Sequence, residues 1–302
     1  MKVVELSGGV GGARMARGLA AVPTIDLTVV VNVGDDDDIH GLHVSADLDT
    51  VIYTLAGVEG PDGWGRSADT FAFNDELARF GVDNRFRIGD LDLALNLFRT
   101  QALAAGKSLS AITSAIATSF DIGADVVPAT DDPLRTEVKV ERDEWISFQE
   151  YFVMRAHRDE VEELRYTGSE AAHPAPGVLD AIEAADLIVI APSNPPLSIW
   201  PILAIDEIRQ AITRHQRVVA VSPLFGGKAL EGPAHRVMAS LGLPPGNAGV
   251  MEAYAGVVDT LVVDTQDADD ARQLDAVEVM VTDTRIKEVA RARELAEEIL
   301  AR

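Results

Sequence analysis

VVELSGGVGGARMARGLAA, residues 3–21, joins an apolar run, four glycines and a helical pattern in that order. Residues 3–6 predict a buried strand, residues 7–12 a tight turn and residues 13–21 a helix. A second run, LTVVVNV at residues 27–33, is almost entirely apolar or β-branched. Continuous apolar strands of this kind are typical of parallel sheets that carry helices on both faces.

Further along the chain, short β-rich runs alternate with stretches of helical or turn character. The runs lie at residues 187–191, 217–221, 260–264 and 277–282. This alternation predicts an α/β fold with a doubly wound, mostly parallel, Rossmann-like sheet. Residues 91–120 are helical in pattern, with one break at Gly106.

Residues 131–166 differ from the rest, because polar and apolar residues alternate at 136–140 and again at 148–154. The alternation predicts a small antiparallel excursion from the main sheet. We assign residues 131–175 to this excursion, since HPAPG at residues 173–177 marks a return to the core. Residues 1–130 and 176–302 form the expected α/β core, with a helical segment at about residues 50–120.

Composition and charge exclude several classes of protein. The 302 residues include 26 Lys and Arg against 49 Asp and Glu, giving a formal net charge of −23. An excess of this size repels nucleic acids and anionic membranes, so neither is an expected partner. With no cysteine there is no disulfide or thiolate nucleophile, and no apolar run is long enough for a membrane span. We expect a soluble, cytoplasmic protein.

The ends of the expected strands carry loops rich in Gly, Ser, Asn and Asp, and ligands of open α/β sheets bind there. In the first loop, Gly8, Gly9, Gly11 and Gly12 expose backbone N–H groups at a helix N-terminus, which predicts a phosphate cradle, with Arg14 in the first helical turn. The alternative is a turn that serves only close packing. An NAD(P) oxidoreductase is disfavoured, because Arg14 stands where the third glycine of the dinucleotide fingerprint belongs.

An acidic segment follows the second strand, with six aspartates between residues 35 and 49. Carboxylates beside a phosphate loop are the usual ligands of Mg²⁺, and Asp35, nearest the strand end, is the preferred one. The aspartates at 36–38 are typical of a solvated surface. Asp47 and Asp49 precede an apolar helix, where capping accounts for one of them but hardly for both.

Two further loops offer polar groups to the same edge of the sheet. Ser193 and Asn194 follow the strand at residues 187–191. Gly226, Gly227 and Lys228 form a second candidate anion site, in which the lysine is either a phosphate counter-charge or a solvated side chain.

These segments together resemble the 2-phospho-L-lactate transferase family of coenzyme F420 biosynthesis, which in actinobacteria is known as the phosphoenolpyruvate-using transferase. The matching segments are SGGVGGAR at residues 7–14, NVGDD at 32–36, GL at 41–42, DLDTVIY at 47–53, GWG at 63–65, IGDLDLA at 88–94, RT at 99–100, TDDP at 130–133, QEYFV at 149–153, SNP at 193–195, SI at 198–199 and SP at 222–223. They cover nearly the whole chain in order.

The resemblance implies transfer of a phospho-lactyl or phospho-enolpyruvyl group from a guanosine diphospho-linked donor to the ribityl hydroxyl of the deazaflavin Fo. GMP is released, and Mg²⁺ is the implied cofactor. It also implies a homodimer. The helical segment at about residues 50–120 becomes the Fo side of the core. Whether the donor carries lactate, enolpyruvate or glycerate stays open, because these acids differ by only a few atoms.

Carried over residue by residue, the resemblance places Asp47, Asp49 and Arg87 on the deazaflavin side. It places Gly8–Gly12, Ser193-Asn194 and Gly226–Lys228 on the nucleotide side. Asp47 and Asp49 are the implied catalytic pair, which orients the hydroxyl or binds Mg²⁺, with Asp35 and Asp49 as metal ligands. Family members usually have Trp-Phe before the Gly-Asp pair, where this chain has Arg85-Phe86-Arg87.

A rival from another class is a nucleotide-sugar-binding regulator that resembles the gluconeogenesis-factor family. That family is related in fold and also opens with a glycine loop. It follows its second strand with Asp-Asp-Gly-Gly-Ser, whereas Asp35 and Asp36 here lead into Asp37, Asp38 and Ile39. The segment at residues 47–53 also favours the transferase.

Overall fold

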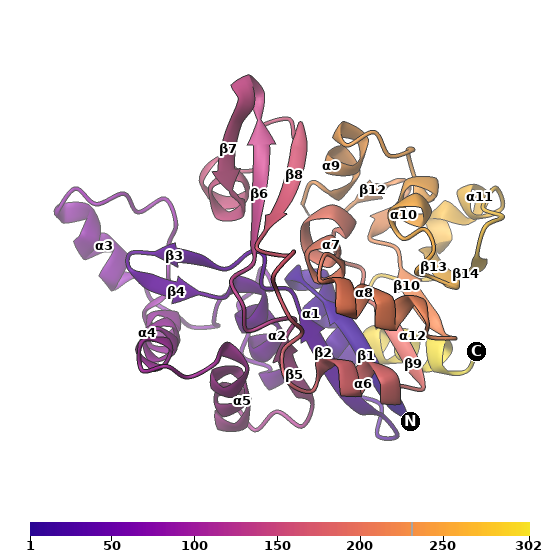
Figure 1. The fold of residues 1–302 in the computed structure, drawn as a ribbon, viewed down its shortest axis with the longest axis horizontal. Helices are drawn as coiled ribbons and strands as arrows, with labels where there is room; N and C mark the ends of the chain where they lie inside the picture. The colour runs from indigo at the N-terminus through magenta and orange to yellow at the C-terminus, as the bar shows by residue number, and fades with distance from the viewer. Residues whose placement is uncertain (231) are drawn as a thin grey trace.

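A seven-stranded parallel sheet forms the centre of the computed structural model, which describes residues 1–230 and 232–302 (Figure 1). The strand order is β14-β13-β10-β9-β1-β2-β5, and every neighbouring pair is parallel. The bounds are β1 Lys2–Ser7, β2 Asp26–Val31, β5 Asp125–Pro128, β9 Leu187–Ile190, β10 Val218–Val221, β13 Thr260–Asp264 and β14 Glu278–Thr282. The predicted fold class is confirmed.

Helices cover both faces of this sheet. On one face α1 (Gly9–Ala20) packs against α2 (Ala46–Ala56) and α12 (Val289–Leu300), and on the other α6 (Val178–Ala184) packs against α8 (Asp206–Thr213) (Figure 1). The remaining helices are α3 Ala72–Arg79, α4 Asp90–Ala104, α5 Leu109–Ser119, α7 Trp200–Leu203, α9 Ala234–Ser240, α10 Asn247–Ala253 and α11 Ala268–Ala271. Within the described part of the chain, no helix is both long and apolar enough to cross a bilayer.

The chain reverses its winding between β1 and β9. From β1 it moves outward through β2 to β5, then returns to β9 and continues the other way through β10 and β13 to β14. Loops that leave the carboxyl ends of β1 and β9 therefore diverge, and such a point is where open α/β sheets bind ligands.

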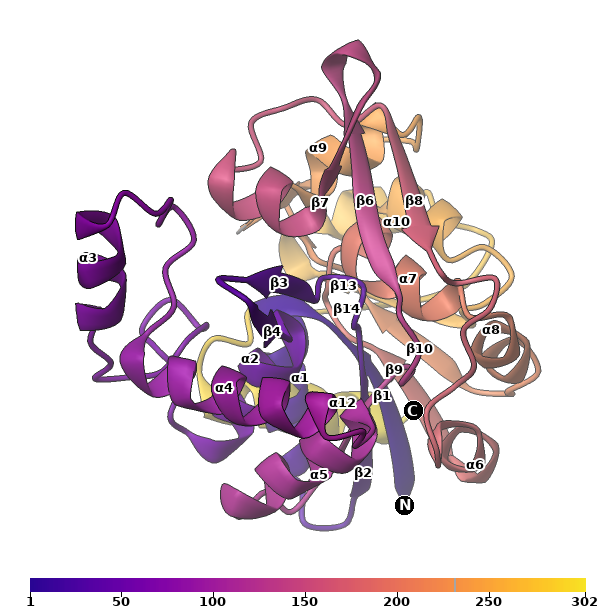
Figure 2. The same ribbon diagram turned by 60° about the vertical axis from the view of Figure 1, so that its left-hand side comes forward.

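An antiparallel sheet of three strands, β7-β6-β8, rises beside this edge (Figure 2). Its strands are β6 Arg135–Val140, β7 Glu144–Ser147 and β8 Glu163–Thr167. Val138, Ile146 and Tyr151 pack with Leu197 of the core and Val237 of α9 in a separate apolar cluster. The excursion is thereby fixed against the loop after β9, next to the ligand-binding edge.

Several local predictions differ from the structure. Residues 150–154 form a π-helical turn instead of a strand, and Gln149 before it donates a hydrogen bond to the Asp35 carbonyl. The acidic segment contains a short hairpin, β3 Asp37–Ile39 and β4 Leu42–Val44, where a loop was expected. Strand β5 went unpredicted because it has four residues and ends in Pro128, as suits a sheet edge.

Candidate functional site

The loops after β1 and β9 are bonded to each other at the point where the winding reverses. The Ser193 hydroxyl donates to the Gly8 carbonyl at 2.7 Å and accepts from the Gly8 amide at 3.3 Å. A Cβ at Gly11 would collide with the Pro192 carbonyl, and one at Gly12 would collide with the Ser7 hydroxyl. Close packing thus requires glycine at 11 and 12.

Gly9 differs from its neighbours in the turn. Its φ is 64°, its Cα faces open space, and it is the first residue of α1, one turn earlier than expected. Its amide donates to Asp47 Oδ1 at 2.7 Å. The glycine turn therefore combines close packing at Gly11 and Gly12 with a helix N-terminus whose Gly9 amide is already bonded to Asp47, while the space beside the Gly9 Cα stays open to a ligand.

Asp47 connects the glycine turn to the acidic loop. It lies in the first turn of α2 but does not cap that helix. Its second oxygen, Oδ2, accepts from Asn32 Nδ2 at 3.0 Å, and Asn32 Oδ1 accepts from the Gly34 amide at 2.8 Å. Burial raises the pKa of Asp47 to about 6, although the bonds from Asn32 and Gly9 favour the carboxylate.

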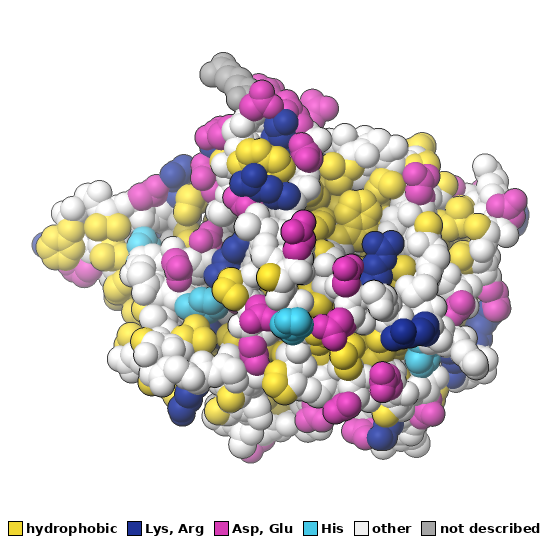
Figure 3. Space-filling view, viewed as in Figure 1, with side chains coloured by type: hydrophobic (Ala, Val, Ile, Leu, Met, Phe, Trp, Pro, Cys, Tyr) yellow, Lys and Arg dark blue, Asp and Glu magenta, His cyan; other side chains and the backbone are white. Residues whose placement is uncertain are grey.

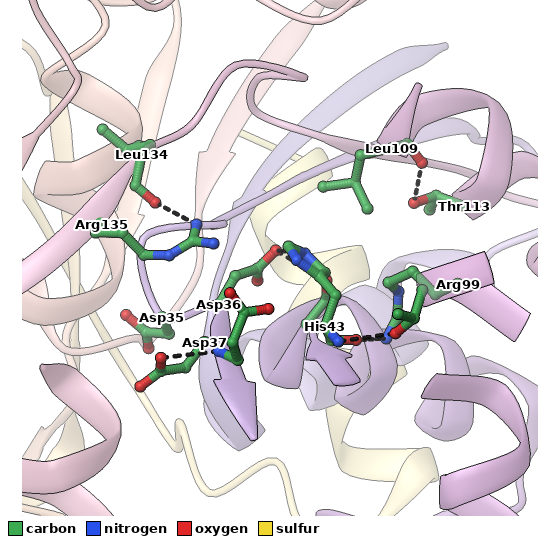
Figure 4. A network of polar contacts seen from close by, with 12 residues as sticks. Asp35, Asp36, Asp37, His43, Arg99, Leu109, Thr113, Leu134 and Arg135 are labelled. Carbon is green, nitrogen blue, oxygen red and sulfur yellow. Dashed lines mark hydrogen bonds and ion pairs between the residues drawn. The ribbon is translucent and has the colours of Figure 1, made fainter. Parts of the chain in front are cut away.

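Asp35 and Asp36 lie buried beside Asp47, each about 3% exposed, so the prediction of a solvated surface at residues 36–38 is wrong for Asp36 and is confirmed only for the exposed Asp38. Asp36 Oδ2 accepts from the Ser45 hydroxyl at 2.8 Å and lies 3.0 Å from His43 Nε2 (Figure 4). The Oδ1 atoms of Asp35 and Asp36 have no hydrogen-bond partner among the described residues. Burial, and then the charge of Asp47, raises the pKa of Asp35 well above its usual range. These two buried oxygens are available to a ligand.

Asp49 is held by Arg99, a buried arginine that belongs to the matching segment at residues 99–100 but was not predicted as a site residue. Arg99, on α4, is 1% exposed and donates through Nη1 and Nη2 to the two oxygens of Asp49, and through Nη1 to Asn96 Oδ1 at 2.7 Å. Burial raises the pKa of Asp49, and the charge of Arg99 opposes the rise. The sequence does carry a sign of this role, because Arg99 is the one charged residue in a helical run at residues 93–105.

The remaining candidate residues lie further out. Arg14 lies beside Gly63 in a cavity of about 120 Å³, which none of the four turn glycines lines. Arg87 pairs with Asp75 at 2.8 Å and stacks on Phe71 near α3, the helix that stands out at the edge of the molecule (Figures 1 and 2).

On the nucleotide side, Asn194 Oδ1 accepts from the Leu197 amide at 3.4 Å, and thereby caps the π-helical turn Pro195–Ile199. Gly226 and Gly227 form the tight turn between β11 (Leu224–Phe225) and β12 (Lys228–Ala229). The Gly227 amide donates to Asp267 Oδ1 at 2.7 Å, so an acidic side chain already occupies this turn. Lys228 is exposed.

The site therefore combines backbone amides, a serine hydroxyl and buried carboxylates. It brings Gly8–Gly12, Ser193, Asp35 and Asp47 together at the carboxyl ends of β1, β2 and β9. Within residues 1–230 and 232–302, no three His, Asp or Glu side chains are placed to hold a metal ion by themselves. Mg²⁺ commonly takes one or two carboxylates, completing its shell with phosphate oxygens and water, so this geometry suits a metal bound together with a diphosphate.

Comparison with known proteins identifies the family. The model of the 2-phospho-L-lactate transferase CofD family matches residues 3–298. The chain belongs to this family. The resemblance stated from the sequence is thus confirmed, and the protein is a CofD-type transferase of coenzyme F420 biosynthesis.

Relatives of the CofD family carry two names. The chain is 43% identical to a phosphoenolpyruvate transferase of Streptomyces griseus, with all of both chains covered. It is 44% identical to a phosphoenolpyruvate transferase of Streptomyces coelicolor, over 93% of this chain and 90% of that one. It is also 40% identical to a 2-phospho-L-lactate transferase of Methanopyrus kandleri, over 99% and 97%.

A solved structure shares the fold of this CofD-type chain. It is a UPF0052 family protein of Bacillus halodurans, with a TM-score of 0.67 and 18% identity over 99% of this chain and 98% of that one. At that identity the likeness concerns the fold alone.

Proposed function

We propose that the protein transfers a phospho-lactyl or phospho-enolpyruvyl group from a guanosine diphospho-linked donor to the ribityl hydroxyl of Fo, with Mg²⁺ as cofactor. The new bond joins the ribityl oxygen to the phosphorus that bears the three-carbon acid. The bond from that phosphorus to GMP breaks, and the hydroxyl proton is lost. The observation that carries the proposal is Asp47, which joins the glycine turn to the acidic loop through its two oxygens.

The residues present fit a magnesium ion. Asp35 and Asp36 each keep one buried oxygen with no partner among the described residues, and oxygen ligands are those that Mg²⁺ takes. We assign Asp35 as the leading ligand. Asp49, the second metal ligand that the resemblance implies, has both oxygens bonded to Arg99, and the charge of that guanidinium balances its own. When bound, Mg²⁺ neutralises charge on the diphosphate.

The chain's own groups bind and orient the two substrates. The glycine turn and the Ser193-Asn194 loop serve the diphosphate, and the hairpin at Gly226–Lys228 serves the nucleotide, with Lys228 as a phosphate counter-charge. Asp47 and Asp49 remain the proposed catalytic pair; because their oxygens accept from Gly9, Asn32 and Arg99, they are held in fixed positions beside the Fo hydroxyl. Because phosphoryl transfer needs positioning and charge neutralisation more than a side-chain nucleophile, this set is sufficient.

Fo fluorescence tests the proposal. With Mg²⁺ and GDP present, Fo emission should change on titration with the protein. Mass spectrometry of the product from lactyl, enolpyruvyl and glyceryl donors then identifies the three-carbon acid. An Fo signal that does not respond, combined with binding of a UDP-sugar, would support the regulator instead.

We also propose that the protein acts in the cytoplasm as a homodimer, without nucleic acid or membrane partners. The charge of −23 supports the absence of polyanionic partners, and Figure 3 shows Asp and Glu side chains spread over the face in view. Leu91, Leu97 and Phe98 on the outer side of α4 are nearly half exposed, and an apolar face of this kind favours a second copy as the occupant. Light scattering after size exclusion tests this, and a monomeric mass at micromolar concentration would contradict it.

A further inference from the structure

Arg135, the first residue of β6, lies over the acidic loop. Its neighbour Thr136 donates its amide to the Gly34 carbonyl at 2.7 Å, which joins the excursion to the turn after β2. Figure 4 shows the guanidinium of Arg135 reaching across this loop toward Asp36 and His43. The Arg135 side chain is neither fully buried nor fully exposed. A strand outside the main sheet thus delivers a cation to the candidate site.

Most of the hydrogen-bonding capacity of Arg135 is unused. Nη1 donates to the Leu134 carbonyl at 2.9 Å. Among the described residues, neither a further hydrogen bond nor an ion pair within 4 Å engages this guanidinium, although Asp35 and Asp36 are nearby. A guanidinium has five N–H donors in a planar fork that matches a carboxylate. The unused donors of Arg135 are therefore available to an anionic ligand.

The local charge balance favours such a cation. Asp35, Asp36, Asp47 and Asp49 are all buried at the site, whereas Arg99 is fully engaged by Asp49 and Asn96. Arg99 balances only Asp49, so an anionic donor would meet repulsion from the other three carboxylates. Mg²⁺ would compensate the diphosphate when bound, but the carboxylate of the three-carbon acid needs a partner of its own.

We propose that Arg135 binds the carboxylate of the three-carbon acid carried by the donor. The inference rests on the proposed function and deepens it. Arg135 stands on the Gly34 side of Asp47, whereas Ser193 and the diphosphate loops stand on the Gly9 side. The acid end of the donor therefore extends from the glycine turn toward β6. Arg135 selects donors that carry a carboxylate, whether lactyl, enolpyruvyl or glyceryl.

The test is a cycle of two variants and two donors, with binding measured by calorimetry in Mg²⁺. One donor is guanosine diphosphate linked to lactate. The other carries an ethyl group in place of the lactyl group and therefore lacks the carboxylate. Arg135→Gln should weaken binding of the lactyl donor by about 30- to 100-fold and leave the ethyl donor within about twofold. Arg135→Lys keeps the positive charge but loses the planar set of N–H donors. Its affinity for the lactyl donor should therefore lie between those of the wild-type protein and Arg135→Gln.

Arg165→Gln is the matched control, because Arg165 lies on the adjacent strand β8, pairs with Glu137, and is outside the site. It should leave both affinities unchanged. Equal weakening of both donors by Arg135→Gln, or the same pattern from Arg165→Gln, would overturn the assignment. If the wild-type protein binds neither donor, the proposed function itself fails. An unchanged melting temperature shows that each variant is folded.

Discussion

Asp49 and Arg99 form a buried ion pair that holds α2 against α4. Removing one partner leaves an uncompensated charge in the interior, at a cost of about 3–5 kcal/mol. We therefore expect Arg99→Met to lower the free energy of unfolding by that amount in urea titration. The double variant Asp49→Asn/Arg99→Met should recover part of the loss, since no buried charge remains. A loss below about 1 kcal/mol in Arg99→Met would show that the pair is dispensable.

Asp35 offers a second prediction at the scale of one residue. Its Oδ1 is the buried oxygen that we assign to Mg²⁺. Asp35→Asn keeps the shape and removes the charge, so it should raise the Mg²⁺ concentration for half-maximal turnover by at least about tenfold. At saturating donor, turnover should fall by about 10²-fold, or 2.7 kcal/mol. Asp38→Asn, on the exposed side of the hairpin, is the control. Equal magnesium requirements in the two variants would remove Asp35 from the metal site.

Glu5 is a buried acid in the middle of β1 that the proposed reaction does not use. Neither of its carboxyl oxygens has a hydrogen-bond partner among the described residues, and burial raises its pKa well above the usual 4.5. The folded protein therefore keeps Glu5 neutral while the unfolded chain ionises. The contribution of Glu5 to the free energy of unfolding is fully present below about pH 4.5. It falls as pH rises toward the native pKa of Glu5, by up to about 1.4 kcal/mol per pH unit.

Glu5→Gln removes this titration. The fall in melting temperature between pH 5 and pH 7 should be smaller in the variant than in the wild-type protein. Scanning calorimetry at matched ionic strength measures both. If the two proteins lose the same number of degrees over that range, Glu5 is ionised in the fold.

At the scale of elements, the crossing of α1 over the loop after β9 depends on glycine. A Cβ at Gly11 would overlap the Pro192 carbonyl, which is backbone and has little room to move. Gly11→Ala should therefore lower stability by about 1–3 kcal/mol and weaken GDP binding, because it separates the two loops. Gly123→Ala is the matched control, since nothing lies within 4 Å of a Cβ there. Thermal melts and calorimetry measure the stability and the GDP affinity of both variants. Equal melting temperatures and affinities would show that α1 can shift without a cost in free energy.

Sequence patterns predicted the apolar strands of the main sheet correctly. They failed for a short segment whose conformation depends on a few tertiary contacts. The strands at β1, β2, β9, β10, β13 and β14 follow from apolar runs that two covered faces require. The alternation at residues 148–154 predicts a strand but occurs in a helical turn. There Gln149 bonds to the Asp35 carbonyl and Tyr151 enters the apolar cluster of the excursion. Tertiary contacts overrode a short local pattern.

At the scale of the whole molecule, the net charge of −23 opposes the approach of an anionic donor. Salt screens this repulsion, since the Debye length falls from roughly 20 Å at 0.02 M to about 7 Å at 0.2 M. We expect the association rate of a fluorescent GDP analogue to increase by about two- to tenfold over that range at constant Mg²⁺. Stopped-flow fluorescence measures it. A rate that falls with salt would mean that the site presents a net positive field despite the total charge.

The sequence by itself determined the fold class, the family and the two chemical ingredients of the site, a glycine turn and a run of aspartates. These are encoded locally, because backbone freedom at glycine and the apolar content of strands depend on adjacent residues. Only the tertiary structure decided which groups meet. Asp47 meets Gly9, Arg99 is held against Asp49, and Arg135 comes to the acidic loop from a separate sheet. Such contacts join residues tens of positions apart, and no local pattern specifies them.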